Sequence, residues 1–192
     1  EYAMDRRKLQ YPLVVLAVAA IALLTNLGAP RLWDRDEPRN ARCAVEMRER
    51  GDWIVPTFNG ELRAHKPVLL YWLMLASYEV CGETEFAARL PSAILGMATA
   101  LATLAMGWNL FSPRAGLLAG TILATTLSFD IAARAATPDA ALLFCVAAAM
   151  AAFVWYVLPR NFTGKKPTTD STEDTEDGVQ AEKLASSAFL GW

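Results

Sequence analysis

The sequence predicts an all-α protein, a polytopic transmembrane helical bundle with two juxtamembrane helices in its first outer loop. Of the 192 residues, 54% are hydrophobic, above the roughly 45–50% of an ordinary soluble protein. Charged residues are still common, with 18 Lys and Arg against 20 Asp and Glu, so apolar and charged residues are segregated along the chain. The net charge of −2 gives no nucleic-acid signature. The three cysteines lie far apart and predict neither a disulfide framework nor a zinc site.

The first expected span covers residues 11–28, a nearly continuous apolar run. A cleaved signal peptide is the alternative, but the run is longer than a typical signal-peptide core and favours an uncleaved anchor. Arg6, Arg7 and Lys8 precede the run, which places the N-terminus in the cytoplasm by the positive-inside rule.

Residues 29–85 form the expected outer loop. Asp36 is a suitable N-cap, Pro38 suits a first turn and Gly51 suits a helix end, which together predict a surface helix over Glu37–Arg50. A second apolar helix begins at Pro67 and is short for a span. We interpret it as interfacial or re-entrant, with a crossing helix as the alternative.

Three further spans complete the N-terminal part of a transmembrane domain over residues 1–158, and they are expected at 86–111, 115–133 and 139–158. Residues 159–183 are poor in apolar residues and rich in Thr, Asp and Glu, which predicts a disordered acidic cytoplasmic loop. Residues 184–192 begin a fifth span that is truncated at Trp192.

Polar residues of this topology gather on the outer side of the membrane. Asp36 at a helix N-terminus could act as a general base, and Lys66 beside the next helix N-terminus suits a phosphate. Asp139 lies at the start of a span, where ionisable residues are functional candidates. Structural interpretations stay open: Asp36 and Asp139 as N-caps, Lys66 as a snorkelling lysine, and Tyr71 as an interfacial aromatic residue. The residues alone therefore predict a polar outer site but no reaction.

Several motifs in order resemble one known family. They are 34–41 (DRDEPRNA), 51–56 (GDWIVP), Asn59-Gly60, 66–72 (KPVLLYW) and 86–92 (FAARLPS). Together they resemble the first outer loop of the C-type glycosyltransferases of the protein O-mannosyltransferase superfamily. The most similar branch is the aminoarabinose (lipid A) transferase-like group.

The resemblance implies a multi-pass enzyme of the cell inner membrane. Such enzymes move a sugar, with inversion, from a polyprenyl-phosphate carrier to a lipid or protein acceptor on the outer face. Asp36 then corresponds to the catalytic base, with Glu37 and Asp139 as further acidic site residues. Lys66 corresponds to the ligand of the donor phosphate, and we group Arg39, Tyr71 and Arg134 with it. The position before the lysine is often acidic in the lipid A branch and is His65 here, so His65 is a weak candidate ligand for a divalent metal, whose presence we leave open.

Length separates this chain from the family, whose members have more spans and an outer soluble domain. The resemblance therefore implies the N-terminal piece of a larger transferase, which we expect to be inactive alone. Two alternatives remain: a component of an anionic-lipid transporter or flippase, and a non-catalytic gene remnant.

Overall fold

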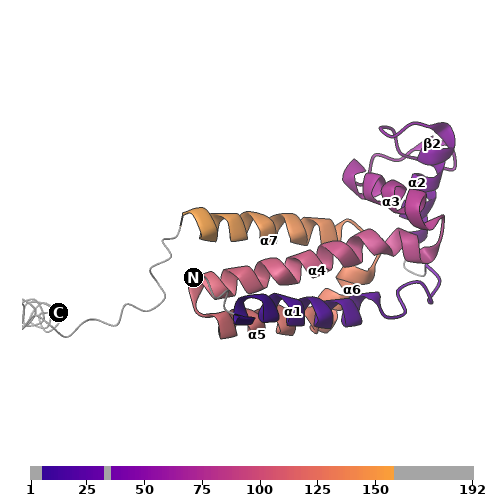
Figure 1. Cartoon of the computed structure of the whole chain (residues 1–192). Helices are drawn as coiled ribbons and strands as arrows, with labels where there is room; N and C mark the ends of the chain where they lie inside the picture. The colour runs from indigo at the N-terminus through magenta and orange to yellow at the C-terminus, as the bar shows by residue number, and fades with distance from the viewer. Residues whose placement is uncertain (1–5, 33–35, 158–192) are drawn as a thin grey trace, which may run out of the picture.

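The computed structural model describes residues 6–32 and 36–157. The expected acidic loop at 159–183 and the fifth span at 184–192 lie outside these residues. Helices α1, α4, α5 and α7 run lengthwise beside one another as a bundle, the short α6 is tilted against α5, and α4 contacts each of the other four (Figure 1). Their bounds are α1 Arg6–Leu24, α4 Glu85–Leu110, α5 Pro113–Ala124, α6 Leu127–Arg134 and α7 Asp139–Tyr156.

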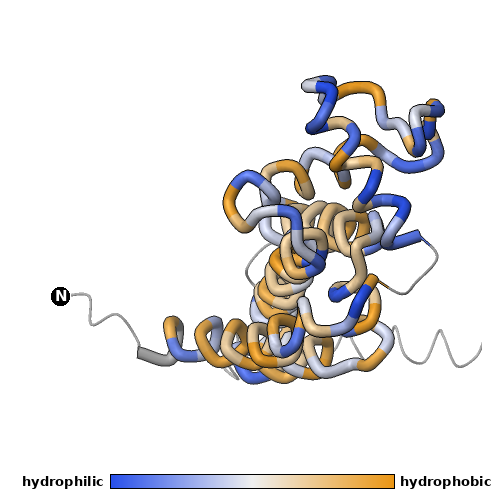
Figure 2. The backbone as a smooth tube through the Cα atoms, turned by 90° about the vertical axis from the view of Figure 1, so that its right-hand side faces the viewer, coloured by the Kyte–Doolittle hydropathy of each residue, from blue (hydrophilic) through white to orange (hydrophobic). Residues whose placement is uncertain are grey.

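A second, smaller unit sits at the end of the bundle where α4 begins (Figure 1). It consists of α2 Glu37–Arg50, the hairpin of β1 Thr57–Phe58 and β2 Glu61–Leu62, and α3 Val68–Cys81. We call it the α2–α3 unit. Figure 2 shows hydrophobic residues along most of the bundle helices, whereas strongly hydrophilic stretches are frequent in this unit. The predicted all-α membrane fold, with two short helices outside the bundle, is confirmed.

Two helices, α4 and α7, are long and apolar enough to cross a membrane, and α5 with α6 makes a third if the bent pair counts as one. The apolar part of α1, Leu9–Leu24, is shorter. The expected span at 11–28 is wrong at its end, because α1 stops at Leu24 and Asn26 adopts a positive φ of 58°. The α3 helix is shorter than a span, as expected.

The span expected over 115–133 is bent in the structure and not a single straight helix. The structure has two helices, α5 and α6, which meet at an angle of 64°. The bend lies at Thr125 and Thr126, whose hydroxyls donate hydrogen bonds to Thr121 O (2.9 Å) and Ile122 O (2.7 Å). Thr121 O keeps the backbone N–H of Thr125 (3.1 Å), but the N–H of Thr126 bonds to Leu123 O (3.1 Å) and not to Ile122 O, where the Thr126 hydroxyl donates in its place.

Glycines allow α4 and α5 to pack backbone against backbone. A Cβ on Gly107 would lie 2.8 Å from Gly116 Cα, and a Cβ on Gly116 would lie 2.8 Å from Trp108 N. Close approach of small residues is a usual way to pack helices in lipid, where no hydrophobic effect drives helices together. Gly107 on α4 and Gly116 on α5 are therefore needed for this contact.

A hydrophobic core joins Cys43 and Met47 of α2 to Tyr71 and Met74 of α3. The same core includes Ala87 and Ala88 of α4 and Ala136, so it also connects the α2–α3 unit to the bundle. The hairpin pairs Thr57 with Leu62 and turns at Asn59-Gly60, where both residues have positive φ. Helix α2 has the predicted bounds, and Gly51 ends it in the left-handed conformation.

Glu46 joins α2 to the hairpin. Its carboxylate accepts hydrogen bonds from Thr57 Oγ1 (2.8 Å) and from the backbone N–H groups of Asn59 (2.8 Å) and Gly60 (3.3 Å). Burial alone would raise the pKa of Glu46, but these hydrogen bonds together with Arg42 outweigh burial and hold the pKa below its ordinary value of 4.5. The carboxylate therefore fixes the hairpin on the helix.

Candidate active site of the α2–α3 unit

Asp36 and Lys66 form the centre of the candidate site. Lys66 Nζ lies 2.8 Å from Asp36 Oδ2, and both side chains are about one-third exposed or less. The Asp36 side chain makes no capping hydrogen bond to α2, and its backbone is helical. The structural alternative of a side-chain N-cap at Asp36 is therefore wrong, because the carboxylate faces Lys66 instead.

Arg63 is a member of the site that the sequence did not single out. Its guanidinium lies 4.0 Å from Asp36 Oδ1 and 5.6 Å from the centre of the Phe58 ring. The side chain is only 14% exposed, and Nε has no hydrogen-bond partner among the described residues. In the sequence, only its position three residues before Lys66, directly after the hairpin, could have indicated that Arg63 belongs to the site.

Tyr71 lies deeper than expected. It is completely buried in the core between α2 and α3, and its hydroxyl is unpaired among the described residues. Burial, reinforced by the nearby Cys43, raises the pKa of Tyr71 to about 12, so the phenol stays protonated. The structure places Tyr71 behind Arg63 rather than on the surface, which does not fit direct contact with a donor phosphate.

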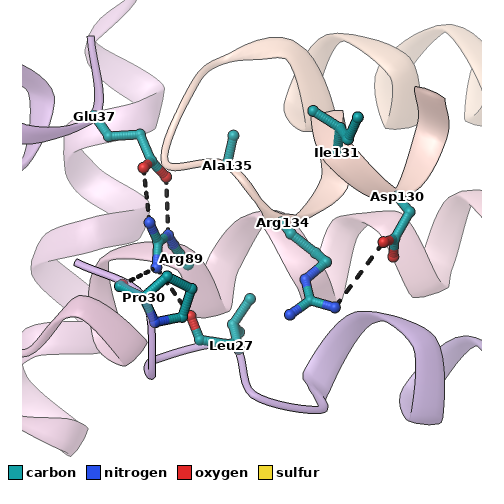
Figure 3. A pocket seen from close by; sticks show the side chains of 8 residues that line it. All are labelled: Leu27, Pro30, Glu37, Arg89, Asp130, Ile131, Arg134 and Ala135. Carbon is teal, nitrogen blue, oxygen red and sulfur yellow. Dashed lines mark hydrogen bonds and ion pairs between the residues drawn. The ribbon is translucent and has the colours of Figure 1, made fainter. Parts of the chain in front are cut away.

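The side chains of Glu37 and its neighbour Asp36 point in different directions because they lie at the first turn of α2. Its carboxylate is 2% exposed and accepts hydrogen bonds from Arg89 Nε (2.9 Å) and Nη2 (2.8 Å) (Figure 3). Arg89 also donates to the carbonyls of Leu27, Pro30 and Arg31. The resemblance groups Glu37 with the catalytic residues, but the geometry makes it a structural connection between α2, α4 and the segment after α1.

The segment between α6 and α7 is held on α2 by both backbone groups of one residue. Ala136 N–H donates to Glu37 Oε1 (2.8 Å), and Ala136 O accepts from Asn40 Nδ2 (3.0 Å). Three residues later Asp139 begins α7, exposed, and accepts a hydrogen bond from Thr137 Oγ1 (2.9 Å). This clamp brings the start of α7 to the N-terminal end of α2, where Asp36 lies.

The remaining predicted residues are distributed differently. Arg134 donates to the carbonyls of Ala22 (2.9 Å) and Thr25 (2.7 Å) at the end of α1, so it caps that helix instead of joining Lys66. Arg39 is half-buried on α2 and has no ion-pair partner within 6–32 and 36–157. His65 is exposed. Across the same described ranges, no three His, Cys, Asp or Glu side chains form a group that could hold a metal ion.

The site therefore presents one carboxylate between two cations, Lys66 and Arg63. Such an arrangement offers an acceptor for a proton and two positive charges for an anionic group, in an ion-paired and partly desolvated surrounding.

Comparison with known proteins identifies the family of the chain. The family model described as dolichyl-phosphate-mannose-protein mannosyltransferase matches residues 65–163, which is more than half of the chain. The chain belongs to this mannosyltransferase family. It is a C-type glycosyltransferase sequence of the aminoarabinose transferase-like branch, as its motifs indicate.

Relatives of the family in bacteria show the same resemblance. An uncharacterized protein of Aquifex aeolicus is 31% identical over 80% of this chain and 30% of its own length. The undecaprenyl phosphate-alpha-4-amino-4-deoxy-L-arabinose arabinosyl transferase of Shewanella sediminis is 39% identical over 47% of this chain and 16% of its own length. The enzyme of that name from Pectobacterium carotovorum is 38% identical over 59% of this chain and 21% of its own length. The chain thus spans less than a third of these relatives.

A solved structure agrees with the family assignment. The crystal structure of ArnT from Cupriavidus metallidurans, bound to undecaprenyl phosphate, matches with a TM-score of 0.69 and 27% identity. The match covers 74% of this chain and 26% of ArnT. The family's membrane fold is therefore present in this chain.

Proposed function

We propose that this chain carries the donor-phosphate and base portion of a membrane glycosyltransferase that uses an undecaprenyl-phosphate-linked sugar. The observation that carries the proposal is the 2.8 Å pair of Asp36 and Lys66, with Arg63 beside it. The family of the chain and the printed activity of its relatives, arabinosyl transfer from an undecaprenyl phosphate, support this choice of donor.

Lys66 and Arg63 would act on the leaving group. The bond between the anomeric carbon and the carrier phosphate breaks during transfer, and the electron pair goes to the phosphate oxygen. Two cations beside that oxygen stabilise the negative charge that develops on it.

Asp36 would act on the acceptor. When the donor phosphate binds Lys66, that ammonium is shared between the phosphate and Asp36, and the carboxylate can accept the proton of the acceptor hydroxyl. Attack from the face opposite to the phosphate gives inversion at the anomeric carbon. Asp139, on the segment clamped to α2 through Ala136, is the second acidic residue that this site would use.

The proposed orientation places the α2–α3 unit on the outer face of the inner membrane, with the N-terminus in the cytoplasm. The donor is then a lipid in the membrane beside the site. A lipid or protein hydroxyl reaches the site from the outer face.

A binding and transfer experiment tests the proposal. Because we expect this chain to be inactive alone, the variants are made in a full-length transferase that carries this segment. Membranes that contain it are supplied with an undecaprenyl-phosphate-linked aminoarabinose donor and a lipid A acceptor, and undecaprenyl phosphate binding is measured by native mass spectrometry. We expect Asp36→Asn to lower transfer by about 100-fold or more while donor binding persists, because general-base catalysis is worth that much. Lys66→Ala should weaken binding instead. Glu61→Gln, an exposed hairpin carboxylate, is the control. Near-normal transfer by Asp36→Asn would contradict the base assignment.

Translocation of an anionic lipid is the second candidate function. The 64° break between α5 and α6 favours it, because transporters commonly have interrupted helices. Movement of a fluorescent polyprenyl phosphate between liposome leaflets, without sugar transfer, would distinguish this function from the first.

A further inference from the structure

A cavity of about 320 Å³ lies away from Lys66, between the segment after α1, the start of α4, and α6 (Figure 3). Its lining combines apolar side chains with two ion pairs. The residues are Leu27, Pro30, Glu37, Arg89, Asp130, Ile131, Arg134 and Ala135. The proposed transfer reaction makes no use of this cavity.

Three of the four charged groups in the cavity are already used by the protein. Glu37 and Arg89 bind each other, and their remaining bonds reach the backbone. Each terminal nitrogen of Arg134 donates one hydrogen bond to a carbonyl at the end of α1, Nη1 to Ala22 O and Nη2 to Thr25 O. Nη1 also lies 3.9 Å from Asp130 Oδ2. Each of those nitrogens keeps a second hydrogen.

Asp130 has a carboxylate oxygen that can still accept a hydrogen bond. Its Oδ1 is buried and accepts no hydrogen bond from any described residue. A buried carboxylate oxygen without a hydrogen-bond donor is unfavourable, and more so when the carboxylate is charged. A ligand that brings an N–H group would remove this cost, and a cationic N–H would also balance the charge.

The outer surface of α6 beside this cavity is apolar. Leu127 and Ile131 lie one helical turn apart on α6 and are 72% and 60% exposed. The cavity is at the end of the bundle where α1 stops and the α2–α3 unit begins, which is the headgroup level of the membrane in the proposed topology (Figure 1). A ligand in this place would have a polar head in the cavity and an apolar tail along α6.

We propose that the cavity binds the headgroup of a lipid that carries a primary ammonium group. The ammonium N–H donates to Asp130 Oδ1, the adjacent phosphate receives the second hydrogens of Arg134, and the acyl chains lie against Leu127 and Ile131. A quaternary ammonium has no N–H to donate, and a headgroup with only negative charge would be repelled by Asp130. The site therefore selects ethanolamine over choline and glycerol headgroups.

The test is lipid selectivity of the purified 192-residue chain in detergent, measured by native mass spectrometry. Phosphatidylethanolamine, phosphatidylcholine and phosphatidylglycerol with identical acyl chains are added at equal concentration. We expect phosphatidylethanolamine to bind about tenfold more tightly than the other two, as one hydrogen bond to a charged group would give. Asp130→Asn should remove this preference, and Glu61→Gln should keep it. Equal binding of the three lipids to the unmodified chain would overturn the proposal, as would an Asp130→Asn protein that keeps the preference.

A second variant covers the case in which Asp130→Asn does not fold, as judged by circular dichroism. Ala135→Met keeps the carboxylate but fills the cavity, so it should also remove the preference. Persistence of the preference in Ala135→Met would show that the lipid binds elsewhere. Undecaprenyl phosphate is absent from all of these measurements, so their outcome does not depend on the proposed transferase function.

Discussion

Glu37 and Arg89 are 52 positions apart in the sequence and are joined by two hydrogen bonds of 2.8 and 2.9 Å between buried side chains. Through Arg89 the pair reaches the carbonyls of Leu27 and Pro30, and through Glu37 it reaches the N–H of Ala136. One ion pair thus connects α2, α4, the end of α1 and the start of α7. The position of Asp36, adjacent to Glu37, depends on that connection.

Removal of Arg89 should destabilise the fold strongly. Arg89→Met leaves the Glu37 carboxylate buried without its cation, and we expect a loss of about 3–5 kcal/mol in the free energy of unfolding. Thermal unfolding followed by circular dichroism in detergent measures it. The matched control is Glu49→Gln, which breaks a 3.6 Å pair with Arg42 between half-exposed side chains and should cost less than about 1 kcal/mol. Equal effects of the two variants would contradict a connecting role for the buried pair.

Arg63 should contribute to donor binding. Arg63→Gln removes one of two cations beside Asp36, and we expect undecaprenyl phosphate to bind about tenfold more weakly, in line with one charge-assisted hydrogen bond. Native mass spectrometry measures the affinity of each protein for undecaprenyl phosphate. Arg50→Gln, at the exposed C-terminal end of α2, should bind as the unmodified chain does. A wild-type affinity in Arg63→Gln would remove Arg63 from the site.

Glu46 should make the protein sensitive to acid. Its pKa is lowered in the folded state, so its contribution is complete above the ordinary value of 4.5 and is lost as the pH falls through the lowered pKa. Glu46→Gln should be less stable by about 1–2 kcal/mol at pH 7. It should also lose less stability than the unmodified chain between pH 7 and pH 3. Parallel pH profiles of the two proteins would contradict this assignment.

The contact between α4 and α5 should not tolerate a methyl group. In Gly116→Ala the new Cβ would lie 2.5 Å from Leu104 O, so the helices must separate, and we expect a loss of about 1–3 kcal/mol in stability. The control is Leu118→Ala on α5. The Leu118 side chain is 60% exposed, so this change should lower the stability less. Unfolding in detergent compares the two, and an unchanged midpoint for Gly116→Ala would mean that the helices do not pack this closely.

The sequence predicted the helices whose ends have local signals. Pro38 and Gly51 mark α2, and Pro67 and Gly82 mark α3, because turn and capping preferences act over a few residues. It did not predict the 64° bend at Thr125-Thr126. Threonine hydroxyls often bond to the preceding turn without a bend, as Thr99 and Thr103 do inside α4, so threonine alone does not identify a break.

The candidate site was predicted in part. The motifs indicated Asp36 and Lys66, and the structure brings them together. They could not separate Asp36 from Glu37, because two adjacent carboxylates differ only in the direction that the helix gives each side chain. The role of Arg89 could not be predicted from its motif, since its partners come from segments that meet only in the folded chain. The metal-binding role considered for His65 stays untested.

The bend between α5 and α6 also has a consequence for α1. It turns α6 so that Arg134 meets the last carbonyls of α1, at Ala22 and Thr25. Helix α1 can therefore stop short of a full membrane thickness with its terminal oxygens satisfied by another helix rather than by water. Two carbonyl oxygens at the end of the first helix thus depend on a residue more than a hundred positions further along the chain, and straightening α5 and α6 would withdraw the Arg134 donors from them.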